Sequence, residues 1–120
     1  MTTISLVSNY QLADSDADQI FGALADPTRR RIVQLLGTRP LRPGELTAAV
    51  GTSAPTMSRH LRVLLRAGLV TDERDAADAR ARIFRLRMQP VSDLQAWLGQ
   101  LQEHWDTQLQ AFKDHVEGQR

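Results

Sequence analysis

The chain has 120 residues, of which 42% are hydrophobic and 24% charged, and it contains no cysteine. This length corresponds to one domain, and the composition is that of a folded protein. The lack of cysteine excludes disulfide scaffolds, thiolate metal sites and cysteine nucleophiles. No apolar run reaches the ~18 residues that a membrane helix needs, and residues 1–10 lack the basic side chain of a secretory signal. We therefore expect a cytoplasmic protein with no membrane partner.

The net charge of +1 hides an uneven distribution. Residues 1–28 carry four acidic side chains and no basic one, whereas residues 29–87 carry thirteen arginines against five acidic side chains. Residues 88–120 are again acidic, with five acidic side chains against two basic ones. A basic middle between acidic ends suggests that the middle meets a polyanion. The alternative is a solvated surface whose charges happen to be uneven.

Two short helices are predicted within residues 14–36. Asp14 or Ser15 can cap the first, and Asp26 can cap the second, with Pro27 at its first helical position. The positions expected to face inward are Ala17, Ile20, Phe21 and Leu24 in the first helix and Ile32, Val33, Leu35 and Leu36 in the second.

A helix-turn-helix is predicted over residues 43–67. The first helix ends at Gly51 and the second is capped by Ser53. The turn between them is too short for antiparallel packing, so the helices must cross steeply, with the small Ala49 allowing a close approach. The inward stripe of the second helix is Met57, Leu61 and Leu64.

Two strands within residues 69–87 are predicted to form a hairpin whose tip is the polar segment 72–81. Pro90 then breaks the chain, and Ser92 caps a long helix over residues 91–117. The predicted fold class is therefore mainly α, an α+β winged helix formed by a single domain that spans the whole chain.

The outward face of the second helix-turn-helix helix suits DNA. Opposite its inward stripe lie Pro55, Thr56, Arg59, Arg62, Val63 and Arg66. Residues near the start of such a helix usually contact base edges in the major groove, and those further along contact phosphates. The expected DNA-binding residues are Ser53, Ala54, Thr56, Ser58, Arg59, Arg62 and Arg66, with Arg80 and Arg82 from the hairpin.

The assignment of the hairpin arginines has an alternative, and one further residue of the helix can be interpreted in two ways. The hairpin arginines can contact phosphate or a minor groove, or they can form salt bridges with the acidic residues of the hairpin. His60 lies beside the inward stripe, and we interpret it as a partly buried packing residue rather than a base contact.

Three segments resemble the ArsR family of bacterial winged-helix transcriptional repressors. They are ALADPTRRRIVQLL (23–36), GELTAAVGTSAPTMSRHLRVLLRAGLV (44–70) and RIFRLR (82–87). The resemblance implies a homodimer that binds operator DNA, usually represses its own or a neighbouring gene, and releases DNA when an effector binds. Two features depart from the family: the cysteine pair of its metal-sensing members is missing, and Arg42 stands where a capping Ser or Thr is frequent. We expect Arg42 to reduce the stability of its helix.

No metal or cofactor is expected. The resemblance implies a possible zinc site, because other members of the family bind zinc through Asp and His at a set spacing on the last helix, but here Asp93 lacks a histidine two residues further on. His104 and His115 lie eleven residues apart, about 16 Å along one helix, which is too far to share an ion within one chain. The alternative is a site shared across a dimer that combines one of these histidines with Asp106 or Asp114. The effector stays open between a small organic ligand, a hard or histidine-bound metal, and none.

The long helix carries one continuous apolar stripe. A domain of this size does not need the whole stripe for its own core, and the surplus would be exposed in a monomer. We expect it to pair with the N-terminal helix and with a second copy of the chain; the alternative is that it folds back on its own domain. The expected interface residues are Ile20, Leu94, Trp97, Leu98, Leu101, Trp105, Leu109 and Phe112.

These patterns together predict a sequence-specific DNA-binding transcriptional regulator, a homodimeric repressor of a pseudo-palindromic operator. The two-fold symmetry of the dimer is the reason for expecting such an operator. An enzyme is not expected, because no metal triad, phosphate-binding glycine loop or nucleophile with a base is visible. The alternative is a winged-helix module that binds protein and has weak or no specific affinity for DNA.

Overall fold

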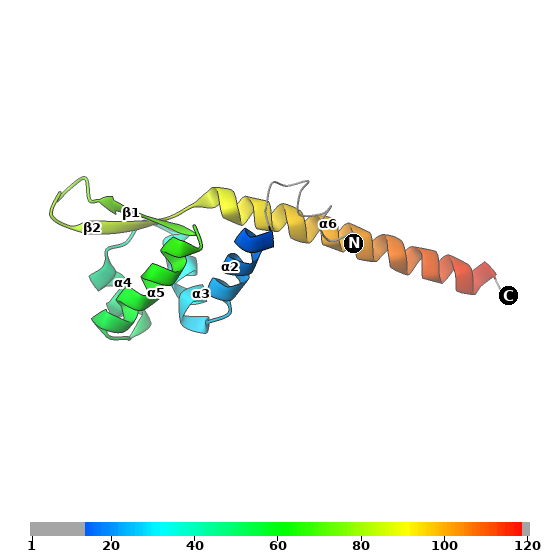
Figure 1. Ribbon diagram of the computed structural model, residues 1–120, viewed down its shortest axis with the longest axis horizontal. Coiled ribbons are helices and arrows are strands. Elements are labelled where there is room, and N and C mark those ends of the chain that lie inside the picture. The colour runs from blue at the N-terminus through cyan, green and yellow to red at the C-terminus, as the bar shows by residue number, and fades with distance from the viewer. Residues whose placement is uncertain (1–13, 119–120) are drawn as a thin grey trace.

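The computed structural model describes residues 14–118. In chain order the elements are α2 (Asp14–Leu24), α3 (Pro27–Leu36), α4 (Pro43–Val50), α5 (Ala54–Arg66), β1 (Val70–Arg74), β2 (Arg82–Leu86) and α6 (Met88–Gly118). Figure 1 shows a compact cluster of α2 to α5, with the β1–β2 hairpin projecting at one end and α6 extending away at the other. The mainly helical winged helix-turn-helix predicted from the sequence is confirmed.

The core lies where α2, α3, α4 and α5 meet the hairpin. Each of these elements contributes at least one side chain that is almost completely shielded from solvent, which is the result of helical and strand periodicity placing apolar residues on one face. Among the described residues, the buried ones are Ala17, Ile20, Ala23, Ile32, Leu36, Leu41, Leu46, Met57, Leu61, Leu64, Leu69, Val70 and Phe84.

Asp26 caps α3, as predicted. Its carboxylate accepts hydrogen bonds from the backbone N–H groups of Thr28 (2.8 Å) and Arg29 (3.1 Å), and Pro27 occupies the first turn. The hydrogen bond from the Arg29 amide, followed by that from Thr28, lowers the pKa of Asp26. The corresponding prediction for α2, a cap by Asp14 or Ser15, concerns side chains outside the described ones.

Two arginines that follow Asp26 close the end of α2. Arg29 Nε donates to the carbonyl of Ala23 (2.6 Å), and Arg30 Nη1 donates to that of Leu24 (2.8 Å). These carbonyls belong to the last turn of a helix, which otherwise leaves them unpaired. Arg29 Nη1 also lies 3.4 Å from Nδ1 of His60, so the α2–α3 corner is joined to α5. His60 is half-buried, as predicted.

Helix α4 begins without a capping side chain. Arg42 occupies the N-cap position but makes no side-chain hydrogen bond to the helix, and only the reverse half of a capping box is present, in which the Glu45 carboxylate accepts from the Arg42 backbone N–H (2.9 Å). At the other end, Gly51 adopts the left-handed conformation (φ 70°) that favours glycine, and Ser53 then caps α5 by accepting from the Thr56 amide (3.3 Å).

Three apolar positions differ from the sequence prediction. Phe21, expected to face the core, is 42% exposed and makes an edge contact with Trp97, with ring centroids 5.7 Å apart. Ala49 is exposed and so does not mediate the approach of α4 to α5. Val63, placed on the outward face of α5, is half-buried because α2 packs against that side of the helix. Periodicity alone does not reveal which side of a helix a neighbour covers.

The hairpin is longer than predicted. Strands β1 and β2 pair antiparallel from Val70 opposite Leu86 to Arg74 opposite Arg82, so the tip is residues 75–81 rather than 72–81. The ion pairs Arg82–Asp72 and Arg85–Glu73 join the two strands, and such cross-strand pairs of opposite charge stabilise a hairpin. Leu41 extends the sheet by an isolated bridge to Phe84.

Helix α6 begins at Met88, and Ser92 is therefore inside it rather than its cap. Pro90 does not break the chain because it lies in the first turn, where its missing N–H would have no helical partner anyway. With 31 residues the helix is about 46 Å long. Val91, Leu94 and Trp97 pack against the core; we call residues 14–97 the body and residues 98–118 the arm.

Candidate nucleic-acid interface

Helix α5 has one face in the core and the opposite face in solvent. Met57, Leu61 and Leu64 are at most 3% exposed, and the arginines on the other side, Arg59, Arg62 and Arg66, are exposed. The helix is held in this orientation by packing against α2, α3 and α4. Its basic side is thus fixed outward, at the surface of the body.

The start of α5 carries a short chain of hydrogen bonds. Ser53 Oγ donates to Oγ1 of Thr56 (2.9 Å), and Arg59 Nη2 donates to the same Oγ1 (3.2 Å). Arg59 is therefore oriented by Thr56 before any ligand is bound. Ala54 and Ser58, which were predicted to lie near base edges, are both exposed.

Further along α5, Arg62 and Arg66 have no charged partner in the part of the chain that the structure describes. Arg62 lies at the edge of a groove of about 580 Å³ between α4, α5 and β2. Arg82 lines the same groove from the wing, and Met57, Leu61 and Phe84 are its apolar lining. The Arg62 guanidinium, which has no charged partner among the described residues, makes this groove attractive to a phosphate.

The arginines of the hairpin, which we call the wing (residues 70–86), differ in how strongly they are already bound. Arg82 pairs with Asp72 (Nε to Oδ1 3.1 Å) and lies 5.1 Å from the centre of the Phe84 ring. This pairing raises the pKa of Arg82 and lowers that of Asp72. Arg85 pairs with Glu73 at 3.5 Å. These two arginines thus form salt bridges within the hairpin, and the DNA contact expected of Arg82 stays a prediction.

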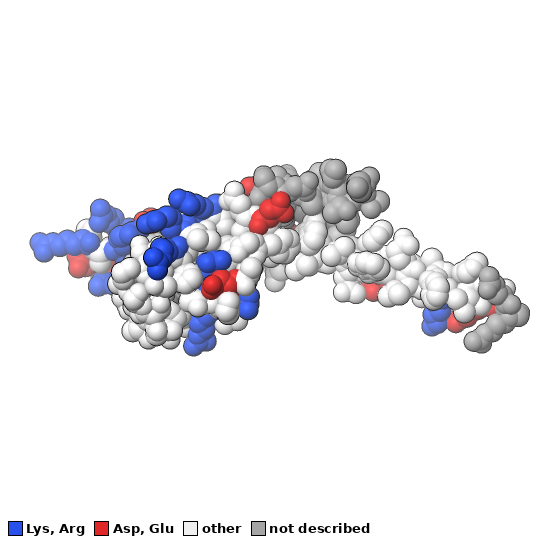
Figure 2. Space-filling model, turned by 60° about the horizontal axis from the view of Figure 1, so that its bottom comes forward, with Lys and Arg blue, Asp and Glu red and all other residues white. Residues whose placement is uncertain are grey.

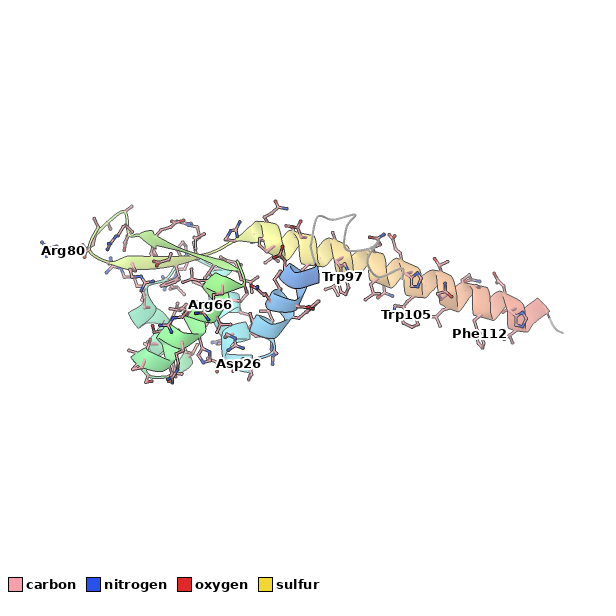
Figure 3. The ribbon with its side chains drawn as sticks, viewed as in Figure 1. Asp26, Arg66, Arg80, Trp97, Trp105 and Phe112 are labelled. Carbon is pink, nitrogen blue, oxygen red and sulfur yellow. The ribbon has the colours of Figure 1, made fainter. Side chains whose placement is uncertain are left out.

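Arg74 and Arg80 form no ion pair within residues 14–118. Arg80 lies at the wing tip, and its side chain points away from the body (Figure 3). No ion pair or side-chain hydrogen bond involves its guanidinium within residues 14–118. Figure 2 shows that basic side chains gather over the wing and the neighbouring body, whereas most of the arm is neither basic nor acidic.

One contact was missed by the sequence analysis. The guanidinium of Arg42 donates from Nε (2.8 Å) and from Nη2 (2.5 Å) to Oδ2 of Asp75, a residue of the wing tip. The amide of Ala77 donates to the other oxygen of Asp75. The Ala77 amide and Arg42 lower the pKa of Asp75, and the carboxylate raises that of Arg42. Two residues separated by 33 positions leave no periodic signal, so nothing in the sequence indicated this pair.

The arm exposes a strip of large apolar side chains. Leu101, Leu94 and Trp97 are half-buried, but beyond them exposure rises to 58% for Trp105 and 67% for Phe112. Figure 3 shows Trp105 and Phe112 along the same edge of the helix. Of the residues predicted for a dimer interface, Ile20 is covered by its own chain. The exposed members of the strip are Leu98, Trp105, Leu109, Phe112 and Val116.

The structure describes no metal-binding cluster: among residues 14–118 no three His, Asp or Glu side chains lie together in a way that could hold an ion. His104 instead makes an edge contact with the ring of Trp105, with centroids 6.5 Å apart. No helix in the same range is both long enough and apolar enough to cross a bilayer.

Two helices in contact across a short turn, an exposed basic helix face and a two-stranded hairpin with an arginine at its tip define a winged helix-turn-helix. The comparison with protein families agrees, since residues 24–73 match the helix-turn-helix domain. Rv2034 of Mycobacterium tuberculosis, an HTH-type transcriptional regulator, is 49% identical over 55 residues, which are 46% of this chain and 51% of that protein. The transcriptional repressor SdpR of Bacillus subtilis is 35% identical over 57 residues, or 48% of this chain and 63% of that protein.

The chain thus spans about half to two thirds of the length of these curated relatives. The solved structure of an ArsR-like transcriptional regulator from Rhodococcus sp. RHA1 is 25% identical and superimposes with a TM-score of 0.77, covering 87% of this chain and 93% of that one. The chain belongs to the ArsR-like family of winged helix-turn-helix transcriptional regulators. The resemblance seen in the three sequence segments is confirmed.

Proposed function

We propose that the protein is a homodimeric repressor that binds a pseudo-palindromic DNA operator in a sequence-specific manner. The observation that carries this proposal is the face of α5 on which three arginines are exposed, opposite a completely buried apolar stripe. The major groove of B-DNA admits one such helix. The similarity to SdpR, which is named a transcriptional repressor, supports the direction of regulation.

The residues of the proposed interface divide by their position. Thr56 and Arg59, at the start of α5, contact base edges, because a guanidinium can donate to O6 and N7 of guanine and a threonine offers a hydroxyl and a methyl group. Arg62 and Arg66 contact phosphates, which position the helix without reading sequence. Arg80 reaches phosphate or a minor groove from the wing tip. The same face includes Ser53, Ala54, Ser58 and Arg82.

The dimer is proposed from the apolar strip of the arm. Exposed hydrophobic surface of this length is unfavourable in water, and pairing with the same strip of a second copy buries it on a two-fold axis. Such a dimer presents two copies of α5 to half-sites one helical turn, about 34 Å, or a multiple of it apart. Leu94, Trp97 and Leu101, which are half-buried, form the edge of the interface toward the body.

Fluorescence anisotropy tests this function directly. The protein is titrated against the DNA upstream of its own gene and against a scrambled duplex of the same composition, at several salt concentrations. We expect the upstream DNA to bind about 10³-fold more tightly or better, with affinity falling steeply as salt rises. Equal, weak and salt-insensitive binding to both duplexes would contradict the proposal and favour a module that binds protein.

The upstream duplex also tests autoregulation, since a repressor of its own gene must bind there. A regulator of bacterial genes must reach the chromosome, which lies in the cytoplasm, and we therefore place the protein there.

A further inference from the structure

We propose that Arg42 is a positioning residue that fixes the direction of the wing through Asp75, so that Arg80 at the wing tip is held ready for DNA. This inference rests on the proposed DNA-binding function. It assigns a role in recognition to a residue that lies outside both α5 and the wing.

The first argument is the geometry of the Asp75 carboxylate. Oδ2 accepts from both Nε and Nη2 of Arg42, and Oδ1 accepts from the backbone N–H of Ala77 at 3.0 Å. The Asp75 side chain is only 14% exposed. One carboxylate therefore shapes the turn of the wing tip and ties that turn to the residue that begins α4.

The second argument is that this tie complements another one at the middle of β2. Leu41 and Phe84 exchange two backbone hydrogen bonds, of 3.1 and 2.8 Å. An isolated two-stranded hairpin is marginally stable, and an attachment at the middle of one strand leaves the tip free to pivot. Arg42 directly follows Leu41, so its side chain adds a second attachment at the far end of the strands, where the Asp75 amide also donates to Ala81 (3.0 Å).

The third argument comes from comparing the ion pairs of the described residues. Arg82–Asp72 and Arg85–Glu73 lie within the wing and move with it, and Arg39–Glu45 joins the connection between α3 and α4 to the first turn of α4. Among residues 14–118, Arg42–Asp75 is the ion pair that connects the wing to the helices. Exposed ion pairs contribute little to stability, but the Asp75 carboxylate is mostly covered. Its hydrogen bonds to Arg42 and to the Ala77 amide together fix one orientation of the wing tip.

The consequence concerns Arg80. Its backbone amide donates to Oδ1 of Asp78 at 3.0 Å within the same tip, so the place of its side chain follows the direction of the tip. A contact made by an immobilised loop does not lose as much conformational entropy on binding as one made by a mobile loop. Fixing the wing therefore strengthens the contribution of Arg80 without any contact between Arg42 and DNA.

The decisive variant is Asp75→Asn. Asparagine keeps an oxygen that can accept from the Ala77 amide, but it removes the charge that binds Arg42. Because the substitution removes a negative charge from the wing, electrostatics alone predicts tighter binding to DNA. Our inference predicts the opposite sign: weaker binding to operator DNA, by about 5-fold. Tighter or unchanged binding by Asp75→Asn would overturn the proposal.

A matched pair of arginine variants tests the other partner. Arg42→Gln and Arg39→Gln remove the same charge at neighbouring positions, but the Arg39 side chain is 63% exposed and pairs with Glu45 rather than with the wing. We expect Arg42→Gln to weaken operator binding several-fold more than Arg39→Gln does. The effects of Arg42→Gln and Arg80→Ala should also be less than additive, because both remove the same wing contact. Equal losses in the two glutamine variants, or full additivity, would contradict the role assigned to Arg42.

A measurement without DNA separates this inference from the proposed function. Backbone ¹⁵N relaxation gives order parameters for the wing tip, residues 75–81, on the nanosecond and faster timescale. We expect Arg42→Gln and Asp75→Asn to lower them and Arg39→Gln to leave them unchanged. Unchanged order parameters in all three variants would overturn the tether even if the wild-type protein binds its operator. Failure of the wild-type protein to bind would instead overturn the proposed function.

Discussion

The body and the arm carry the same kind of apolar stripe but use it differently. Among the residues that the structure describes, all thirteen buried apolar ones lie between Ala17 and Phe84, within the body. Helix α6 has 31 residues and none that is buried. In α5 the stripe is covered by other helices of the same chain, whereas in the arm it faces solvent. The arm extends away from the other labelled elements (Figure 1). An amphipathic pattern therefore predicts that a face is to be covered, but not by which molecule.

Charge separates the two regions in the same way. Exposed arginines line α5 and the wing, and the arm instead exposes tryptophan, leucine and phenylalanine. Basic surface attracts DNA, and apolar surface without charge favours association with protein. Under the proposed function, the body binds the operator and the arm joins two bodies. Each of the following predictions compares a substitution in one region with a matched one elsewhere.

The largest effect is expected in the core of the body. Leu64→Ala removes a side chain with no exposed surface, and such substitutions lower the free energy of unfolding by about 2–5 kcal/mol. The same change at Leu109, which is 62% exposed, should lower stability only through weaker association. Urea unfolding at two protein concentrations measures both: the loss in Leu64→Ala is independent of concentration, and that in Leu109→Ala depends on it. A concentration-independent loss of similar size at Leu109 would contradict the comparison.

Phe112→Glu should separate the dimer. It places a charge within the exposed strip, and loss of a central aromatic side chain from an interface costs about 2 kcal/mol or more. We expect the dissociation constant of the dimer, measured by analytical ultracentrifugation, to rise at least about 30-fold. Thr107→Glu is the matched control, because it adds the same charge on the opposite side of the arm. Similar dissociation in both variants would show that the strip is not the interface.

Much of the fold could be predicted from local signals. The Asp26 cap, the Gly51 turn and the inward stripe of α5 depend on residues a few positions apart, and each is present in the structure. The start of α6 could not be placed because proline is tolerated in a first turn as well as at a break. The place of the Phe21 side chain could not be predicted either, because it packs against Trp97, which is 76 positions away in the sequence.

The candidate site shows the same limit. The exposed arginines of α5 follow from helical periodicity, whereas the state of each wing arginine does not. Arg82 is bound to Asp72 and Arg80 is unpaired within the described residues, although the two are close neighbours in the sequence. Strand register decides which carboxylate each arginine meets, and the register could not be read from a segment without apolar alternation.

Within α5, substitution of Arg59 and of Arg66 should change DNA binding in different ways, and not only by different amounts. Arg59→Ala should reduce operator affinity by about 1–3 kcal/mol and relax the preference at one base pair, because its guanidinium reads a base edge. Arg66→Ala should weaken binding to operator and scrambled duplex alike and should reduce the salt dependence by about one ion. Anisotropy titrations on both duplexes measure the two effects. Equal losses on both duplexes for Arg59→Ala would contradict its assignment to a base.

The smallest effect is expected from the cap at the α2–α3 corner. The folded state lowers the pKa of Asp26 below its ordinary value, so the unfolded chain takes up a proton more readily. The stabilisation by the charged cap is therefore present above the ordinary carboxyl pKa of about 4 and is lost as the pH falls through the lower folded-state value. Asp26→Asn keeps a capping oxygen but removes this proton linkage.

The melting temperature of Asp26→Asn, followed by circular dichroism from pH 7 to pH 3, should consequently fall less steeply with acid than that of the wild-type protein. Asp18→Asn is the control, since Asp18 is exposed on α2 and makes no hydrogen bond within residues 14–118. Its acid dependence should match the wild type. If Asp26→Asn matched the wild type as well, the carboxylate would cap α3 no better in its charged form than an amide does, and the acid sensitivity of the body would have to come from the wing carboxylates Asp72 and Asp75, whose pKa values are also lowered.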